Sequence, residues 1–88
     1  MKHYTIKIYG RVQGVFFRKS AREMAEKLNL SGYAKNEPDH TLFIEVEGEE
    51  EKLDEFLKWC NDGPELARVE KLRVMEADLK NFKGFELI

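Results

Sequence analysis

The residues best suited to chemistry lie in one segment, GRVQGVFFR, which runs from Gly10 to Arg18. An alternating apolar pattern precedes the segment and an amphipathic pattern follows it, so it is predicted to join a strand to a helix. Backbone N–H groups in the first turn of a helix lack intrahelical acceptors and attract anions. Glycine supplies unusual backbone angles, and the Arg18 guanidinium is a planar donor that matches two phosphate oxygens. These features predict a phosphate site, although a tight turn beside a solvated arginine explains the same residues.

The segment does not match the common nucleotide-binding loops. Neither the spacing GxxxxGK[ST] nor the spacing GxGxxG is present, so nucleotide binding is not implied. The formal net charge of −2 argues against a broad nucleic-acid-binding face. The charge is uneven, because residues 1–36 hold eight Lys or Arg against two Glu, whereas the remainder holds seven basic and fifteen acidic residues. We therefore expect an anionic ligand at the basic, N-terminal part of the chain.

Hydrophobic periodicity predicts the elements that position this loop. Alternation of apolar and polar residues predicts strands over residues 3–9, 32–36, 41–47 and 69–75, and a last short strand in the tail FKGFELI. Apolar residues at helical spacing predict helices over about 17–28 and within GEEEKLDEFLKWC, whose acidic start suits the positive end of a helix. The apolar positions change phase between Val69 and Leu72, which predicts a bulge.

The order of these elements, β-α-β-β-α-β, is typical of a ferredoxin-like fold. In that α+β sandwich, two helices pack on one face of an antiparallel sheet. A chain of 88 residues is long enough for one core and too short for separate cofactor and substrate domains. We therefore expect a single domain over residues 1–88.

Three motifs resemble those of one family, the acylphosphatases. GRVQGVFFR closely resembles the family signature GxVQGVxFR. GYAKN, from Gly32 to Asn36, is similar to the family element G[WFY]xxN, and GPELARV, from Gly63 to Val69, is similar to GPxxAxV. Together with the order of elements, the resemblance covers essentially the whole chain and implies one acylphosphatase-like domain.

The resemblance implies hydrolysis of the carboxyl-phosphate bond of small acyl phosphates to a carboxylate and inorganic phosphate. It implies in-line attack by a positioned water, with no metal, no cofactor and no phosphoenzyme. Carried over by position, the catalytic residues are Arg18, whose guanidinium binds the phosphoryl group, and Asn36, which positions the water. The phosphoryl group is then cradled by the backbone amides of Gln13, Gly14, Val15, Phe16, Phe17 and Arg18. An acyl phosphate has a good leaving group, so positioning and charge stabilisation matter more than a strong base.

Three positions depart from the usual pattern of that family. Asp39 is followed by His40, whereas the family often has Asp-Gly in this turn. Tyr33 and Ala34 stand where Trp and Val are commoner. These differences bear on the turn geometry and the shape of the pocket rather than on the two catalytic residues.

The other reactive residue types are interpreted as structural. His3 and His40 are far apart in the sequence and Cys60 lies elsewhere, so no metal-ligand spacing is present. Cys60 belongs to the apolar stripe of the second predicted helix, and Met24 and Met75 are also expected in the core. The aromatic residues match no RNA-recognition motif, and EGEEEKLDE lacks the ligand pattern of a calcium loop.

Composition bounds the location and the partners. A single cysteine excludes an internal disulfide, and no stretch approaches the roughly 20 apolar residues needed to span a membrane. We expect a cytoplasmic monomer that binds neither nucleic acid nor membrane, with a small acyl phosphate as substrate and inorganic phosphate as product. Two alternatives stay open: a silent domain that keeps the anion pocket for binding alone, and an interaction module with no phosphate role.

Overall fold

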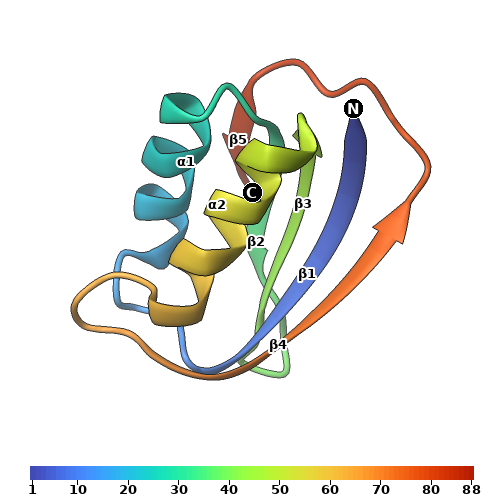
Figure 1. The fold of residues 1–88 in the computed structure, drawn as a ribbon. Coiled ribbons are helices and arrows are strands. Elements are labelled where there is room, and N and C mark those ends of the chain that lie inside the picture. Colours follow the sequence, from blue (N-terminus) through green and yellow to red (C-terminus); the bar gives the residue numbers. More distant parts are fainter.

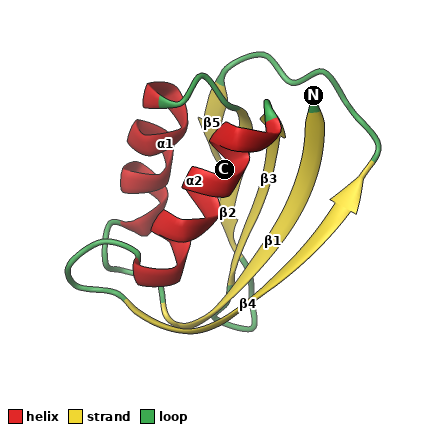
Figure 2. Cartoon of the chain, in the orientation of Figure 1, coloured by secondary structure: helices red, strands yellow, loops and turns green.

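Two helices cover one face of a five-stranded sheet (Figure 1) in the computed structural model, which describes all 88 residues. The elements are β1 (Lys2–Arg11), α1 (Phe17–Lys27), β2 (Ser31–Asn36), β3 (Leu42–Gly48), α2 (Glu50–Asp62), β4 (Arg68–Ala77) and β5 (Phe85–Leu87). Each lies where the periodicity of the sequence predicts an element (Figure 2). The α+β sandwich with a ferredoxin-like arrangement is therefore confirmed.

The strands lie in the order β4-β1-β3-β2-β5. The first four in the chain pair antiparallel, as predicted, whereas β5 pairs parallel with β2. The sheet is therefore mixed. The cause is the path of residues 78–84, which carry the chain from β4 at one edge of the sheet to β5 at the other (Figure 1). Because β2 and β5 begin at the same end of the sheet, they run in the same direction.

One apolar core lies between the helices and the sheet. The helices contribute Phe17, Ala21, Ala25, Leu53, Phe56 and Cys60, and the central strands contribute Ile6, Ile8, Leu42, Ile44 and Val46, all at most 1% exposed. Burying each large apolar side chain stabilises the fold by roughly 1.5–3 kcal/mol. The expected core position of Cys60 is confirmed, and burial raises the pKa of its thiol.

The long edge strand β4 confirms one prediction and overturns another. Its register against β1 shifts so that Tyr9 lies opposite Lys71 and Gly10 lies opposite Val69, which leaves Glu70 as the extra residue of a bulge. Met75, in contrast, is 60% exposed, so its predicted core position is wrong. It lies opposite Thr5, on the sheet face that the helices do not cover, and no further strand flanks β4.

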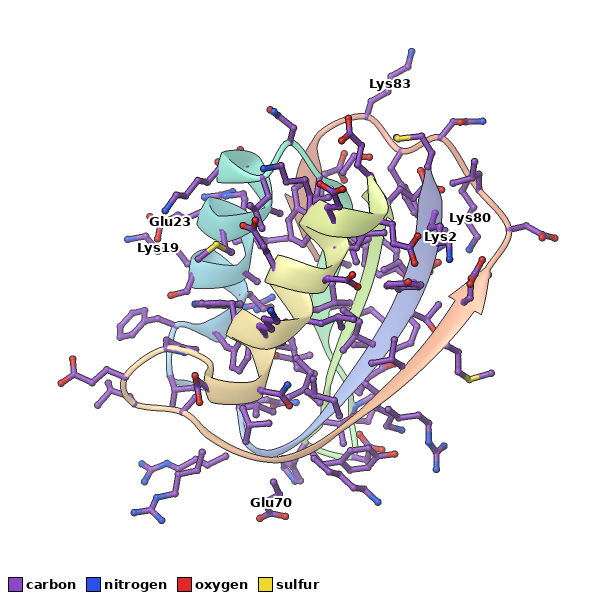
Figure 3. All side chains as sticks on the ribbon, viewed as in Figure 1. Lys2, Lys19, Glu23, Glu70, Lys80 and Lys83 are labelled. Atoms are coloured by element: carbon purple, nitrogen blue, oxygen red, sulfur yellow. The ribbon has the colours of Figure 1, made fainter.

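Neither helix has the length and apolar composition that crossing a membrane requires. Both are instead amphipathic, with charged side chains directed away from the core. Figure 3 shows Lys19 and Glu23 projecting outwards from α1.

Candidate active site

The loop between β1 and α1 has an unusual backbone. Gly14 and Phe16 adopt the left-handed region, with φ angles of 70° and 63°. This conformation is rare for a bulky residue such as phenylalanine and is associated with functional sites. Helix α1 begins directly after Phe16, with no side-chain cap and no acidic residue in its first turn. The positive end of the helix is therefore left without a protein anion.

The N–H groups of this loop point to no acceptor in the protein. From Gly14 to Lys19 none donates a hydrogen bond, and the first that does is that of Ser20, to the Phe16 carbonyl at 3.0 Å. The neighbouring side chains of Val15 and Phe17 are buried and fix the loop to the core. The loop is thus a rigid run of free donors, the arrangement that binds anions at helix N-termini.

Gln13 ties this loop to the turn between β2 and β3. Its Nε2 donates to the Glu37 carbonyl at 2.9 Å and to the Thr41 carbonyl at 3.0 Å. The Gln13 side chain therefore fixes the distance between the two loops and does not face the pocket. Of the predicted phosphate-binding residues, Gln13 and Val15 are absent from the pocket lining, whereas the other four belong to it.

A pocket of about 260 Å³ opens beside the loop. Its lining consists of Val12, Gly14, Phe16, Phe17, Arg18, Lys19, Asn36 and Leu87. Two of these side chains are cationic and none is acidic. Charge, free N–H donors and shape therefore all favour a small anion at this place.

Arg18 projects from the first turn of α1 into this pocket. Its Nη1 donates to the main-chain oxygen of Ile88 at 2.7 Å, and the guanidinium has no other partner in the protein. A guanidinium has five N–H donors, so most of them remain available to a ligand. Leu87 and Ile88, with Lys19, were missed by sequence reasoning. A short final strand is visible in the sequence pattern, but its neighbour in the sheet is not.

Asn36 reaches the same pocket from the end of β2. Its side chain is exposed and makes no hydrogen bond within the protein, so its carbonyl and amide groups are both free. The start of α1 and the end of β2 lie at the same end of the molecule (Figure 1), which brings Arg18 and Asn36 together. The structure thus unites the two residues that the motifs singled out separately.

The turn between β2 and β3 keeps a hairpin geometry despite its unusual sequence. His40 has a φ angle of 70°, in the left-handed region where glycine is common. Asp39 accepts hydrogen bonds from the Thr41 hydroxyl at 2.5 Å and backbone N–H at 3.1 Å, and pairs with Lys7 at 3.0 Å. The Thr41 hydroxyl and Lys7 lower the pKa of Asp39 to about 2.

The remaining reactive residue types lie away from the pocket. Cys60 is in the core, His40 is in the exposed turn, and His3 is buried between Glu45 and Glu47 on the open face of the sheet. No three His, Cys, Asp or Glu side chains converge in a way that would hold a metal ion.

The fold and the pocket together define an α+β protein whose first helix begins without a capping side chain and beside two cationic residues. The relatives of the chain identify its family. Residues 4–87 match the family model described as Acylphosphatase. An acylphosphatase of Rubrobacter xylanophilus is 45% identical over 87 residues, covering 98% of this chain and 79% of that relative. The crystal structure of acylphosphatase from Bacillus subtilis superposes with a TM-score of 0.97 at 34% identity, covering 100% of this chain and 99% of that one.

A third similarity is to part of a much larger protein. Full-length HypF, in a phosphate- and nucleotide-bound form, superposes with a TM-score of 0.93 at 35% identity, covering 99% of this chain and 12% of that one. The fold therefore also occurs as a segment of a longer chain. The family model and the acylphosphatase relatives match nearly the whole chain. They show that this chain belongs to the acylphosphatase family and is an enzyme of that family.

Proposed function

We propose that this enzyme hydrolyses small acyl phosphates to a carboxylate and inorganic phosphate. The observation that carries the proposal is the pocket at the start of α1, where Arg18, Asn36 and a run of unpaired backbone N–H groups meet. Each of these groups suits one part of a phosphoryl transfer, and no acidic side chain lines the pocket to repel the substrate.

The phosphoryl group binds in the loop. The free N–H groups from Gln13 to Arg18 donate to its oxygens, and the Arg18 guanidinium supplies a full positive charge. Gln13 and Val15 take part through the backbone only, because the Gln13 side chain is engaged with the β2–β3 turn and the Val15 side chain is buried. This arrangement stabilises the charge that develops on the equatorial oxygens during transfer.

Asn36 positions the attacking water. An amide cannot act as a base, but its carbonyl oxygen accepts from water and its NH₂ donates to a phosphoryl oxygen. The water oxygen forms the new P–O bond in line with the breaking one, and the acyl oxygen leaves with the bonding pair as a carboxylate. The proton of the water passes to a phosphoryl oxygen. The leaving group is good, so this step needs neither a metal nor a phosphoenzyme.

The second candidate function is phosphate binding without turnover. The similarity to a segment of HypF in a phosphate- and nucleotide-bound form favours it, because that protein uses the same fold within a larger chain. The presence of Asn36 at the pocket favours hydrolysis instead, since binding alone does not require a group that orients water.

Measurements of hydrolysis, of inhibition and of thermal unfolding on the wild-type protein test the proposal. We expect acetyl phosphate to be hydrolysed, inorganic phosphate to inhibit competitively, and phosphate to raise the thermal midpoint by mass action. Thermal protection by phosphate without hydrolysis would replace the proposal with the binding-only function. Absence of both effects would remove the phosphate role altogether.

The cytoplasmic location, the monomeric state and the extent of the domain stay predictions. We propose that residues 1–88 act as one domain, because elements from both ends of the sequence pack on one core, and that this domain acts as a monomer. Sedimentation equilibrium of the active protein is the test, and activity confined to a dimer would contradict the proposal.

A further inference from the structure

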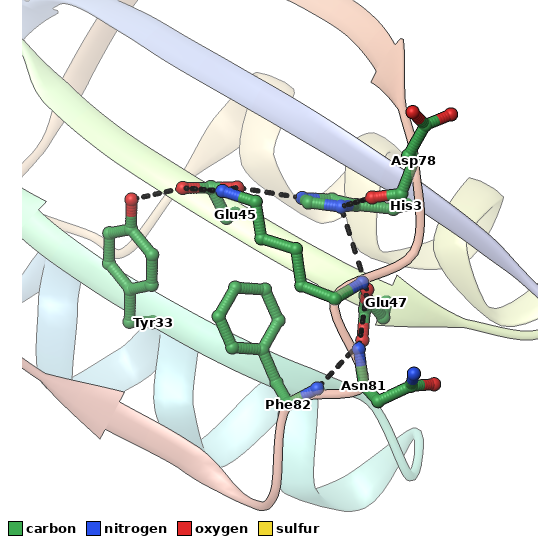
Figure 4. A network of polar contacts seen from close by, with 8 residues as sticks. His3, Tyr33, Glu45, Glu47, Asp78, Asn81 and Phe82 are labelled. Atoms are coloured by element: carbon green, nitrogen blue, oxygen red, sulfur yellow. Dashed lines mark hydrogen bonds and ion pairs between the residues drawn. The ribbon is translucent and has the colours of Figure 1, made fainter.

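A buried polar network lies on the face of the sheet opposite the helices (Figure 4). We propose that its central carboxylate, Glu47, is a positioning residue for Arg18, acting through residues 78–84 and β5. The proposal rests on the function proposed above in one respect, that Arg18 binds the phosphoryl group. It assigns a role in the active site to a residue on the opposite side of the sheet, outside all three motifs.

Glu47 anchors the backbone of residues 78–84. The side chain is 3% exposed. Oε2 accepts from the N–H groups of Lys80 and Asn81, the latter at 3.2 Å, and Oε1 accepts from the N–H group of Phe82 at 2.9 Å. A single carboxylate thus satisfies three successive donors of a segment that has no regular secondary structure (Figure 4). Hydrogen bonds to an ionised acceptor are the stronger kind.

His3 and Lys80 connect this anchor to a second carboxylate, Glu45. The His3 ring is fully buried, with Nδ1 2.6 Å from the Asp78 carbonyl and 3.5 Å from Glu47, and Nε2 paired with Glu45 at 2.8 Å. The Nδ1 atom must donate, since a carbonyl only accepts. Lys80 pairs with Glu45 at 3.1 Å. The two buried carboxylates thus lie beside the His3 ring, and Glu45 also has the Lys80 ammonium as a charged partner.

Aromatic packing closes the network. The Phe82 ring lies edge-on to His3, with centroids 5.7 Å apart, and edge-on to Tyr33 at 5.8 Å. The Tyr33 hydroxyl donates to Glu45. Residues 78–84 are thus held by both the polar anchor and an aromatic contact, and their path across the sheet is fixed.

This path determines where Ile88 lies. Strand β5 has only three residues at the sheet edge, of which Phe85 is buried in the core. It is guided into place by residues 78–84, and bonds from Gly32 N–H to the Gly84 carbonyl at 2.9 Å and from Ile88 N–H to the Ala34 carbonyl at 3.0 Å flank it. The main-chain oxygen of Ile88 is in turn the only protein partner of the Arg18 guanidinium. Loss of the hydrogen bonds to Glu47 is therefore expected to displace Ile88 and to leave the Arg18 guanidinium without its fixed partner.

The test replaces Glu47 with glutamine, a variant that keeps the shape and one acceptor oxygen but loses the charge and replaces the other acceptor oxygen with an NH₂ donor. We expect Glu47→Gln to weaken inorganic phosphate binding, measured by calorimetry, about threefold to tenfold. We also expect the NMR signal of the Arg18 side-chain Nε–H to shift and broaden. The matched control is Ile6→Val, a change in the core between the helices and the sheet. At a comparable loss of stability in urea, the control should leave both readouts unchanged, and equal effects of the two variants would overturn the proposal.

A double-mutant cycle separates a specific coupling between Glu47 and Arg18 from a general loss of stability. If Glu47 acts through Arg18, Glu47→Gln should have a much smaller effect on phosphate binding in an Arg18→Lys background. Full additivity would contradict the coupling. Should Glu47→Gln fail to fold, Phe82→Leu weakens the same segment and keeps the carboxylate, and the same two outcomes apply.

This test still decides the coupling between Glu47 and Arg18 if the proposed hydrolytic function is disproved. If the wild type binds phosphate but hydrolyses no acyl phosphate, the hydrolytic function falls and the phosphate affinities still decide the coupling. If the wild type binds no phosphate, the Arg18 signal decides it: a shift in Glu47→Gln alone supports the coupling, and an unchanged signal removes it.

Discussion

Arg18 and Asn36 carry different parts of the proposed reaction. Arg18 belongs to a helix start that already attracts anions, so its contribution is charge and a fixed fork of donors. Asn36 adds no charge and sits exposed at the end of β2, so its contribution is to orient a neutral molecule. Substitutions at the two positions should therefore fail in different ways, one in binding and the other in turnover.

Arg18→Ala should nearly abolish phosphate binding and leave the fold intact. The change removes charge-assisted hydrogen bonds worth roughly 1.5–3 kcal/mol each, while the side chain contributes little to the core. Calorimetry with inorganic phosphate and a thermal unfolding curve provide the two measurements. Lys19→Ala, which removes a neighbouring exposed cation, is the matched control and should have a smaller effect. Binding at wild-type strength in Arg18→Ala would show that another residue holds the phosphate.

The residues of the site were predictable to the extent that their motifs are local. Arg18 and Asn36 stand in two short motifs, and the structure places both in one pocket. Leu87 and Ile88 carry no such signal, because Ile88 contacts Arg18 only through a main-chain oxygen, which does not depend on the residue type. The role proposed for Glu47 is equally invisible in the sequence, where it is one carboxylate in an acidic run.

At the scale of elements, the loop and the strand that carry the site depend on glycines of two kinds. Gly14 has a φ angle of 70° and open space around the position of a Cβ atom. Gly32, in β2, has a φ angle of 149°, and a Cβ atom there would lie 1.9 Å from the Glu45 carbonyl oxygen. The first glycine is needed for conformation alone, whereas the second is also needed for the close approach of two strands.

We expect Gly14→Ala to cost about 1–2 kcal/mol of stability, the cost of the left-handed conformation. Gly32→Ala should cost distinctly more, on the order of 3 kcal/mol or above, because the strands must separate. Urea unfolding followed by circular dichroism measures both. Equal losses in the two variants would mean that the β2–β3 pairing adjusts freely. Gly14→Ala should also weaken phosphate binding, since the free N–H groups change direction.

The elements themselves follow from periodicity, whereas their neighbours in the sheet do not. Alternation and helical spacing predict the helices and strands, and even the bulge at Glu70. The parallel pairing of β5 is decided by residues 78–84, which have no periodic pattern and are held by side chains from β1 and β3. The exposure of Met75 has the same origin, because an apolar residue in an edge strand looks like a core residue until the strand order is known.

At the scale of the whole molecule, the buried carboxylates make stability depend on pH. Burial acts to raise the pKa of Glu47, but the N–H groups of Lys80, Phe82 and Asn81 outweigh it, so the pKa lies below its ordinary value. Burial likewise acts to raise the pKa of Glu45, and Tyr33 and Lys80 outweigh it. A carboxyl group whose pKa is lowered by folding stabilises the folded state above its unfolded pKa and loses this effect as the pH falls.

The free energy of unfolding should therefore decline as the pH falls below the ordinary glutamate value of 4.5. Urea unfolding at a series of pH values from 7 to about 2.5 measures it. Glu47→Gln cannot titrate at this position and should show a shallower decline than the wild type, with Lys2→Met as the control for a surface ion pair. A variant with the full wild-type slope would show that Glu47 is not among the groups responsible.

The most direct test of the central claim is the hydrolysis of benzoyl phosphate, followed by absorbance in the presence of a metal chelator, for the wild type and Asn36→Ala. We expect the wild type to turn over without loss of rate in the chelator. Asn36→Ala should bind inorganic phosphate nearly as well and turn over about 100-fold more slowly, the effect of losing a positioning group. A wild type that binds phosphate and hydrolyses no benzoyl phosphate, or an Asn36→Ala variant with undiminished turnover, would contradict the account.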